Sequence, residues 1–231
     1  HLSPQGKEEA IATGKHLKEF LSSDATEGLD LSQVKIITSP FIRCVETASL
    51  IAEQLNITTL TLEENICEWL GNTIYDQTPL PDLAVKTGDP EDLTRWTRGR
   101  TLQWSEKKFQ TPQFPEIGCF DRLKDTFDDY QQDIRDQGGK NIIIAVGHGY
   151  FVRSLINIVT GRHDRLPYPK YCAVDEVVLD QKSGQWEIVR KMDCRHTQDS
   201  DQFYLCTLFA PSHSLMFIPD FLRDEVNLRS V

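Results

Sequence analysis

The stretch that decides the fold is Asn141-Ile142-Ile143-Ile144-Ala145-Val146-Gly147-His148-Gly149. Its unbroken apolar run is typical of a strand that is buried on both faces, as the strands of a parallel sheet are. The spacing of apolar residues directly after it predicts a helix over residues 150–160. A strand that passes into a helix in this way is the repeating unit of α/β proteins. We therefore expect a mostly parallel central sheet that is flanked by helices.

The same alternation of strands and helices runs through the rest of the sequence. Ser3 is a favoured helix cap and Pro4 suits a first helical position, so a helix is expected to begin there. Apolar periodicity predicts helices over residues 4–21, 40–55 and 117–137, and β-branched or apolar runs predict strands over 34–37, 58–62, 174–180 and 186–192. The last two strands are separated by a short turn and are expected to form a hairpin.

A length of 231 residues allows one large domain with an appendage. Residues 71–115 contain five prolines and no clear periodicity, and so long a stretch is uncommon in a compact domain unless it carries function. We interpret it as an inserted lid that holds short helices. Two apolar runs, Phe203–Phe209 and Leu215–Ile218, follow the last predicted strand. The expected organisation is a domain over residues 1–197 and a C-terminal apolar extension over residues 198–231.

The composition excludes several classes of function. With 25 Lys and Arg against 35 Asp and Glu the net charge is -10, which argues against a nucleic-acid binder. No segment supplies the ~18 uncharged apolar residues that a membrane helix needs. The six cysteines are scattered and form no C-x-x-C pair, which favours a reducing compartment. We expect a cytoplasmic protein that binds neither nucleic acid nor a membrane.

Two predicted strand-to-helix junctions carry residues suited to phosphate, and ligands of open α/β sheets bind beyond the carboxyl ends of the strands. Arg43 falls in the first turn of a helix, where a guanidinium lies beside free N–H groups. The alternative is an ordinary surface arginine. His148 lies between Gly147 and Gly149, which give backbone access and turn the imidazole toward the cleft. The alternative here is a capping histidine in a turn.

A third candidate is Glu68, which lies beside Cys67 and Trp69. Partial burial among apolar neighbours would raise the pKa of its carboxyl group and make it a usable general acid. Glu63 and Glu64, which precede it, are expected to be solvated.

Taken in order, these segments resemble the histidine phosphatase superfamily, also called phosphoglycerate mutase-like. The resembling segments are Leu2-Ser3-x-x-Gly6 with the helix after it, Ser39-Pro40-x-x-Arg43-Cys44-Val45-Glu46-Thr47-Ala48, Glu68-Trp69, Gly147-His148-Gly149 and Trp186 to Thr197. Within the superfamily, Arg43–Ala48 and Cys67–Leu70 look most like the eukaryotic branch that includes the suppressor of T-cell receptor signalling phosphatases. The resemblance covers residues 1 to about 197.

The resemblance implies a three-layer fold and a metal-independent phosphomonoester hydrolase without a cofactor. Arg43, His148 and Gly149 would bind phosphate, His148 would stabilise charge on the transferring group, and Glu68 would protonate the leaving oxygen. The substrate would be a small phosphorylated molecule or a phosphoprotein, and a homodimer stays open as an alternative. Two other functions also stay open. One is a mutase, whose second phosphate could be held by Arg95, Arg98 and Arg100; the other is a non-catalytic phosphate-binding scaffold.

One feature departs from the family pattern, because this sequence has no Arg-His-Gly motif. In the family that motif ends the first, central strand and supplies a histidine that forms the phosphohistidine intermediate. His1 is not expected to replace it, and Arg195-His196-Thr197 fits the closing strand of the family better. His16, His163 and His213 are expected on the surface.

Two explanations of the missing motif remain, namely an incomplete sequence of an active phosphatase or a shortened relative that has lost its nucleophile. We prefer the first, because losing a central strand would expose a long buried sheet edge. Pairing of Phe203–Phe209 into the vacant place would count against this preference.

Overall fold

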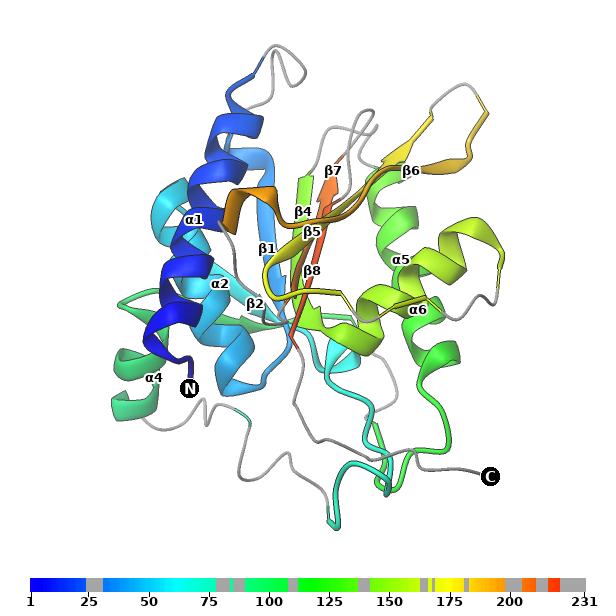
Figure 1. Ribbon diagram of the computed structural model, residues 1–231, viewed down its shortest axis with the longest axis horizontal. Helices are drawn as coiled ribbons and strands as arrows, with labels where there is room; N and C mark the ends of the chain where they lie inside the picture. The colour runs from blue at the N-terminus through cyan, green and yellow to red at the C-terminus, as the bar shows by residue number, and fades with distance from the viewer. Residues whose placement is uncertain are drawn as a thin grey trace.

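The protein is described by a computed structural model. It covers residues 1–23, 31–77, 84, 90–107, 112–136, 142–162, 166–167, 169–180, 183–197, 205–210 and 216–220. The architecture has three layers, with a sheet between two pairs of helices (Figure 1). Helices α1 (Pro4–Leu21) and α2 (Ile42–Leu55) cover one face, and α5 (Phe120–Asp136) and α6 (Gly149–Thr160) cover the other. The expected α/β class is confirmed.

Four parallel strands form the half of the sheet that carries the predicted junctions. They are β1 (Val34–Thr38), β2 (Thr59–Leu62), β3 (Thr101–Trp104) and β4 (Ile142–His148), in the order β3-β2-β1-β4. The register sets Thr38 of β1 opposite Leu62 of β2 and Val146 of β4. The carboxyl ends of these three strands therefore meet at one edge of the sheet. The predicted site residues lie at the ends of these strands or in the segments directly after them.

The other half of the sheet contains the expected hairpin and two strands from the C-terminal segment. The hairpin is β5 (Ala173–Leu179) and β6 (Trp186–Asp193), which pair antiparallel. Strands β7 (Leu205–Ala210) and β8 (Met216–Asp220) lie between β4 and β5 and pair with both. Figure 1 shows them in orange and red in the middle of the sheet.

The expectation that a first, central strand is absent from this sequence stays a prediction, and β7 and β8 lie beside β4 in the sheet. Residues 205–209 of the apolar run pair with β4 and β5. Strand β8 runs parallel to β4 and antiparallel to β5. The apolar sequence of this segment explains why it enters the sheet, since both faces of a central strand are covered. No local pattern in the sequence indicated which strands it would join.

Local signals set the boundaries of the helices, and α1 begins at the expected residue. The Ser3 hydroxyl accepts a hydrogen bond from the Gly6 amide at 3.1 Å, which caps α1 at Pro4. Helix α2 begins at Ile42 rather than at Pro40, because Phe41 holds an extended conformation and its carbonyl accepts the first bonds of the helix. Helix α6 ends at Gly161, whose φ of 63° is left-handed.

The region expected to form a lid, residues 71–115, is partly packed against the rest of the domain. Helix α4 (Pro90–Thr97) packs on α2 through Trp96, which clusters with Val45 and Leu62. Strand β3 extends the sheet beside β2. The parts at 78–83, 85–89 and 108–111 lie outside the described residues, and the role of a lid stays a prediction. The described residues also include three short 3-10 helices, η2 (Leu31–Gln33), η3 (Glu64–Ile66) and η4 (Arg195–Thr197).

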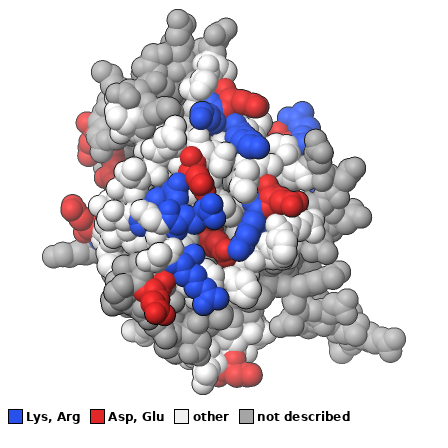
Figure 2. Space-filling model, turned by 90° about the vertical axis from the view of Figure 1, so that its left-hand side faces the viewer, with Lys and Arg blue, Asp and Glu red and all other residues white. Residues whose placement is uncertain are grey.

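Charges on the α1, α2 and α4 side of the molecule are interspersed rather than gathered by sign (Figure 2). Lys7 pairs with Glu46 at 3.0 Å, and Arg98 pairs with Glu53 at 2.6 Å. The described residues of this face therefore form no broad basic surface. None of the helices within the described residues is both long and apolar enough to cross a membrane.

Helices α1 and α2 pack so closely at Gly14 that a side chain has no room there. A Cβ atom at this position would lie 2.7 Å from Gln54 Cγ and 3.0 Å from the Cα of Ile51. The second atom belongs to the backbone, so it cannot rotate away. Gly14 therefore sets the distance between the two helices.

Two imidazoles form a stacked pair where α1 meets η4. The rings of His16 and His196 lie 4.8 Å apart at an interplanar angle of 4°. Arg190 donates to His16 Nε2 at 2.8 Å, and His196 Nε2 lies 3.1 Å from the Thr13 hydroxyl. Burial, with His16 beside it, lowers the pKa of His196 to about 4, and burial and Arg190 lower the pKa of His16. His16, which was expected on the surface, is half-buried.

We predict that Gly14→Ala lowers the free energy of unfolding by about 1 kcal/mol. Alanine gains ~1 kcal/mol of helix propensity, but overpacking against the Ile51 backbone costs ~1–3 kcal/mol. Lys15→Ala, at an exposed neighbouring position, is the matched control. Urea unfolding measures both variants, and a stabilised Gly14→Ala would show that the two helices separate at no cost.

We also predict that acidification from pH 6.5 toward pH 4 destabilises the fold through the two imidazoles. Their pKa values are depressed in the folded state, so the unfolded chain binds protons first, and the stability present above pH ~6.5 is lost as the pH falls. His196→Gln, which cannot titrate, should flatten this slope in urea unfolding series. His1→Gln, at an exposed histidine, should leave the slope as it is. Equal slopes for all three proteins would contradict the prediction.

Candidate active site

The two predicted junctions lie side by side at the carboxyl edge of the sheet. The Ser39 amide donates to the Val146 carbonyl at 2.9 Å, so the residues that leave β1 and β4 stay in contact. Helix α2 then brings Arg43 over the end of β4, and its Nη2 lies 2.8 Å from Nδ1 of His148. The residues that sequence reasoning joined into one pocket are therefore neighbours in the structure.

His148 is fully buried, and both ring nitrogens have partners. Because the Arg43 guanidinium can only donate, Nδ1 accepts its hydrogen bond and the ring proton lies on Nε2. Nε2 is 2.8 Å from the Ser39 hydroxyl, which accepts that proton. Burial and the guanidinium groups of Arg43 and Arg122 hold the pKa of His148 well below its ordinary value. The imidazole is therefore neutral at neutral pH.

The alternatives of an ordinary surface arginine at position 43 and a capping histidine at position 148 are both wrong. The Arg43 side chain is only 12% exposed, and it lies over the Phe41 ring at 4.7 Å, so it is no ordinary surface arginine. His148 occupies the residue before α6, yet its side chain makes no capping bond. Gly149 is the buried first residue of α6, so the ring lies at the N-terminal end of that helix.

Glu68 completes the cluster from the segment after β2. Its carboxylate is 5% exposed, and Oε2 lies 3.6 Å from Arg43 Nη2 and 3.4 Å from His148 Nδ1. Oε1 accepts a hydrogen bond from the Trp69 amide at 3.1 Å. The structure thus brings together a guanidinium, an imidazole and a carboxyl group from three separate segments, at the edge where ligands of α/β sheets bind.

The expectation that Glu63 is solvated is wrong. Its carboxylate is 1% exposed and accepts hydrogen bonds from the Tyr130 hydroxyl at 2.8 Å and from the Asn65 amide at 3.2 Å. The reason is tertiary: β2 ends beneath α5, whose Tyr130 faces the sheet. Glu64, one residue on, is half-buried.

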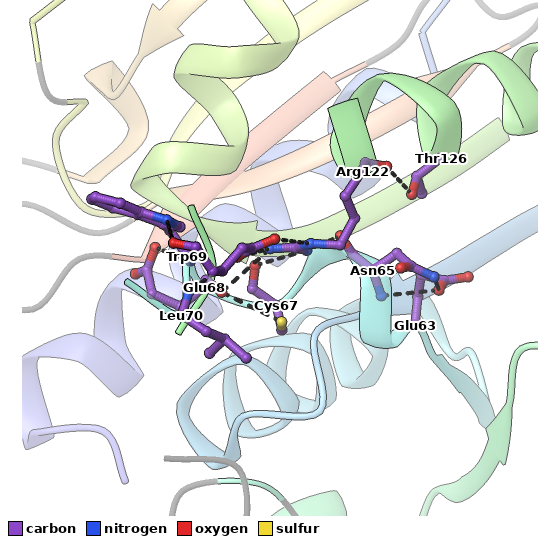
Figure 3. Close-up of polar contacts among 9 residues, drawn as sticks. Glu63, Asn65, Cys67, Glu68, Trp69, Leu70, Arg122 and Thr126 are labelled. Atoms are coloured by element: carbon purple, nitrogen blue, oxygen red, sulfur yellow. Dashed lines mark hydrogen bonds and ion pairs between the residues drawn. The ribbon is translucent and has the colours of Figure 1, made fainter. Parts of the chain in front are cut away.

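Sequence reasoning missed Arg122 and Glu116, which hold the Glu68 segment from the side of α5. Figure 3 shows Arg122 reaching from α5 to the backbone of that segment. Its guanidinium pairs with Glu116 at 2.8 Å and donates to the Cys67 carbonyl at 3.4 Å. The signal was weak, because Arg122 is one of many charges in a polar helix and its contacts come from distant positions in the chain.

The other basic and imidazole candidates lie in other surroundings. Arg98 pairs with Glu53, and Arg100 donates to the Arg98 carbonyl at 3.0 Å, which fits the surface cluster that was the alternative to a second phosphate site. His1 stacks on Trp96 of α4 at 6.0 Å, and His196 stacks on His16 of α1. His163 and His213 lie outside the described residues.

Comparisons with known proteins identify the family of this chain. A family model described as the histidine phosphatase superfamily (branch 1) matches residues 1–193, a range that includes Arg43, Glu68 and His148. Among solved structures, the ecdysone phosphate phosphatase EPPase from Bombix mori, in complex with tungstate, is 18% identical with a TM-score of 0.49, covering 81% of this chain and 70% of that chain. No curated protein sequence matches. Because the family model spans most of the 231 residues, this chain belongs to branch 1 of the histidine phosphatase superfamily.

Proposed function

We propose that the cluster of Arg43, Glu68 and His148 binds the phosphoryl group of a phosphate monoester and supports its hydrolysis. The observation that carries the proposal is the contact of one buried guanidinium with both a neutral imidazole and a carboxyl group. Small phosphorylated molecules and phosphoproteins are the substrate classes that we propose, in the cytoplasm.

Arg43 is suited to receive the phosphoryl oxygens. It lies in the first turn of α2, where a guanidinium and the positive end of a helix both attract an anion. The Glu68 carboxylate occupies one side of the guanidinium, at 3.6 Å. A phosphate dianion would repel that carboxylate, and the repulsion falls when Glu68 takes up a proton. Phosphate binding thus favours the acid form that the reaction needs.

His148 is suited to stabilise charge that develops on the phosphoryl group. Its ring is neutral in the empty site because burial and nearby guanidiniums depress its pKa. An anion bound against the ring would raise that pKa, so the imidazole can gain a proton as negative charge builds up. Such stabilisation by groups already in position is the main source of catalysis in phosphoryl transfer.

The proposed hydrolysis has two steps, as the family resemblance implies. A histidine nitrogen attacks phosphorus, the bond from phosphorus to the leaving oxygen breaks, and Glu68 gives its proton to that oxygen. Water then attacks the phosphohistidine, the P–N bond breaks, and the Glu68 carboxylate takes the proton of the water. The nucleophile would come from an Arg-His-Gly motif, which these 231 residues do not contain.

A second candidate function is a phosphate-binding module without turnover. One observation favours it, because the motif is missing from this sequence. A mutase gains no support from Arg98 and Arg100, because Arg98 pairs with Glu53 and Arg100 donates to the carbonyls of Thr97 and Arg98. Binding and turnover therefore need separate experiments.

For binding, we predict that Arg43→Ala weakens the affinity for inorganic phosphate or vanadate by about 10- to 100-fold. The loss of charge-assisted hydrogen bonds to the anion is the reason. Isothermal titration calorimetry measures it, and Arg98→Ala, which removes an exposed guanidinium, is the matched control. Equal affinity of the wild type and Arg43→Ala would rule out this pocket.

For turnover, we predict that the protein carrying an Arg-His-Gly motif ahead of this sequence hydrolyses 4-nitrophenyl phosphate, and that His148→Ala lowers its kcat by about 100-fold or more. Circular dichroism of the variant checks that the fold is retained. A wild type that binds phosphate but releases no 4-nitrophenol would overturn hydrolysis and favour the binding module.

A further inference from the structure

Arg122 and Glu116 form a buried ion pair against the acid segment, by which we mean residues 65–70. The two side chains are 9% and 10% exposed, and Arg122 Nε donates to Glu116 Oε1 at 2.8 Å while its Nη2 donates to Oε2 at 3.0 Å. This is the two-pronged geometry that fixes a guanidinium most firmly. The orientation of Arg122 is therefore set by Glu116.

The remaining hydrogens of the guanidinium point at the backbone of the acid segment. Nη1 donates to the carbonyls of Asn65 and Cys67, the latter at 3.4 Å, and Nη2 lies 3.5 Å from the Glu68 carbonyl. Figure 3 shows these contacts converging on Arg122 from Asn65, Cys67 and Glu68. One side chain of α5 thus joins three carbonyl groups of a segment that is neither helix nor strand beyond Ile66.

Glu116 holds the same segment from its other end. Its Oε2 accepts from the Leu70 amide at 3.1 Å, and its own amide donates to the Leu70 carbonyl at 2.9 Å. The Glu116 carbonyl accepts from the Trp69 indole at 3.0 Å. The ion pair and its backbone therefore fix residues 65–70 on both sides of Glu68.

Fixing this backbone also fixes the Glu68 carboxylate. The Trp69 amide donates to Oε1, so the direction of the carboxyl group depends on the peptide that follows it. Oε2 is then directed toward Arg43 and His148. Burying a guanidinium and a carboxylate costs several kcal/mol of desolvation, and an apolar pair could fill the same space more cheaply. Positioning a loop is a task that an apolar pair could not perform.

We propose that Arg122, braced by Glu116, is a positioning residue that holds Glu68 in contact with Arg43 and His148. The inference rests on the proposed function for the meaning of that contact. Arg122 does not touch the phosphoryl site itself. It acts through the carbonyls of the acid segment, and its charge acts on the His148 ring from the α5 side while Arg43 acts from α2.

Two variants separate the hold of Arg122 on the acid segment from the effect of its charge on the His148 ring. Arg122→Lys keeps the positive charge but loses the planar fork, so it should release the acid segment while leaving the titration of His148 close to that of the wild type. Arg122→Met loses both, so it should release the segment and raise the pKa of His148. Arg98→Met, which breaks an exposed Arg–Glu pair outside the site, is the matched control.

Hydrogen exchange of the Trp69 and Leu70 amides, followed by NMR on the full-length chain, measures the release. We expect both amides to exchange roughly tenfold faster or more in the two Arg122 variants, because each amide donates to a carboxylate that the pair holds in place. The pKa of His148 is followed by ¹⁵N NMR of the imidazole in the same samples. If Arg122→Met does not fold, Arg122→Lys and Glu116→Gln carry the exchange test.

Unchanged exchange at Trp69 and Leu70 in Arg122→Lys would overturn the inference. So would an Arg122→Met variant in which His148 titrates as in the wild type. Calorimetry with inorganic phosphate on the wild type judges the proposed function separately. If the wild type binds phosphate but amide exchange is unchanged in the Arg122 variants, only the positioning role is contradicted. If exchange is faster in the variants but the wild type does not bind phosphate, only the proposed function is contradicted.

Discussion

The contact between Arg43 and His148 is the interaction on which the rest of the site depends. It joins two strand-to-helix junctions that lie 105 positions apart in the sequence. Because a guanidinium can only donate, it fixes which imidazole nitrogen carries the proton and so gives Ser39 its hydrogen bond. The contact also places the positive charge of Arg43 in a buried environment. The Glu68 carboxylate, 3.6 Å away, balances that charge.

Buried charges around the site come in opposite pairs at two depths. Arg43 with Glu68 lies at the edge of the sheet, and Arg122 with Glu116 lies behind it, against α5. A protein with a net charge of -10 can hold a site for an anion in this way, because the local field is set by the nearest guanidiniums. The arrangement is costly in desolvation, which favours a role in geometry over a role in stability.

Arg43 and His148 could be predicted from the sequence because the rule behind them is local. A strand end, a turn and a helix start are all visible within ten residues, and parallel strands bring such junctions to one edge. The burial of Glu63 could not be predicted, since it depends on Tyr130 of α5. Arg122 escaped notice for the same reason, because its partners in the acid segment are more than fifty positions away. Packing between elements that are distant in the sequence determines both the burial of Glu63 and the contacts of Arg122.

The place of β7 and β8 between β4 and β5 has a consequence for how the chain reaches its native state. As the chain emerges from the ribosome, β4 can pair with β1 long before residues 205–220 are made. Its other side stays an open apolar edge until then, and such edges recruit strands from other chains. Closing the sheet also requires pairings between distant positions, which form slowly. Among the described strands, β4 therefore keeps an unpaired edge from its own synthesis until that of β8, and during this interval the sheet is open to pairing with other chains.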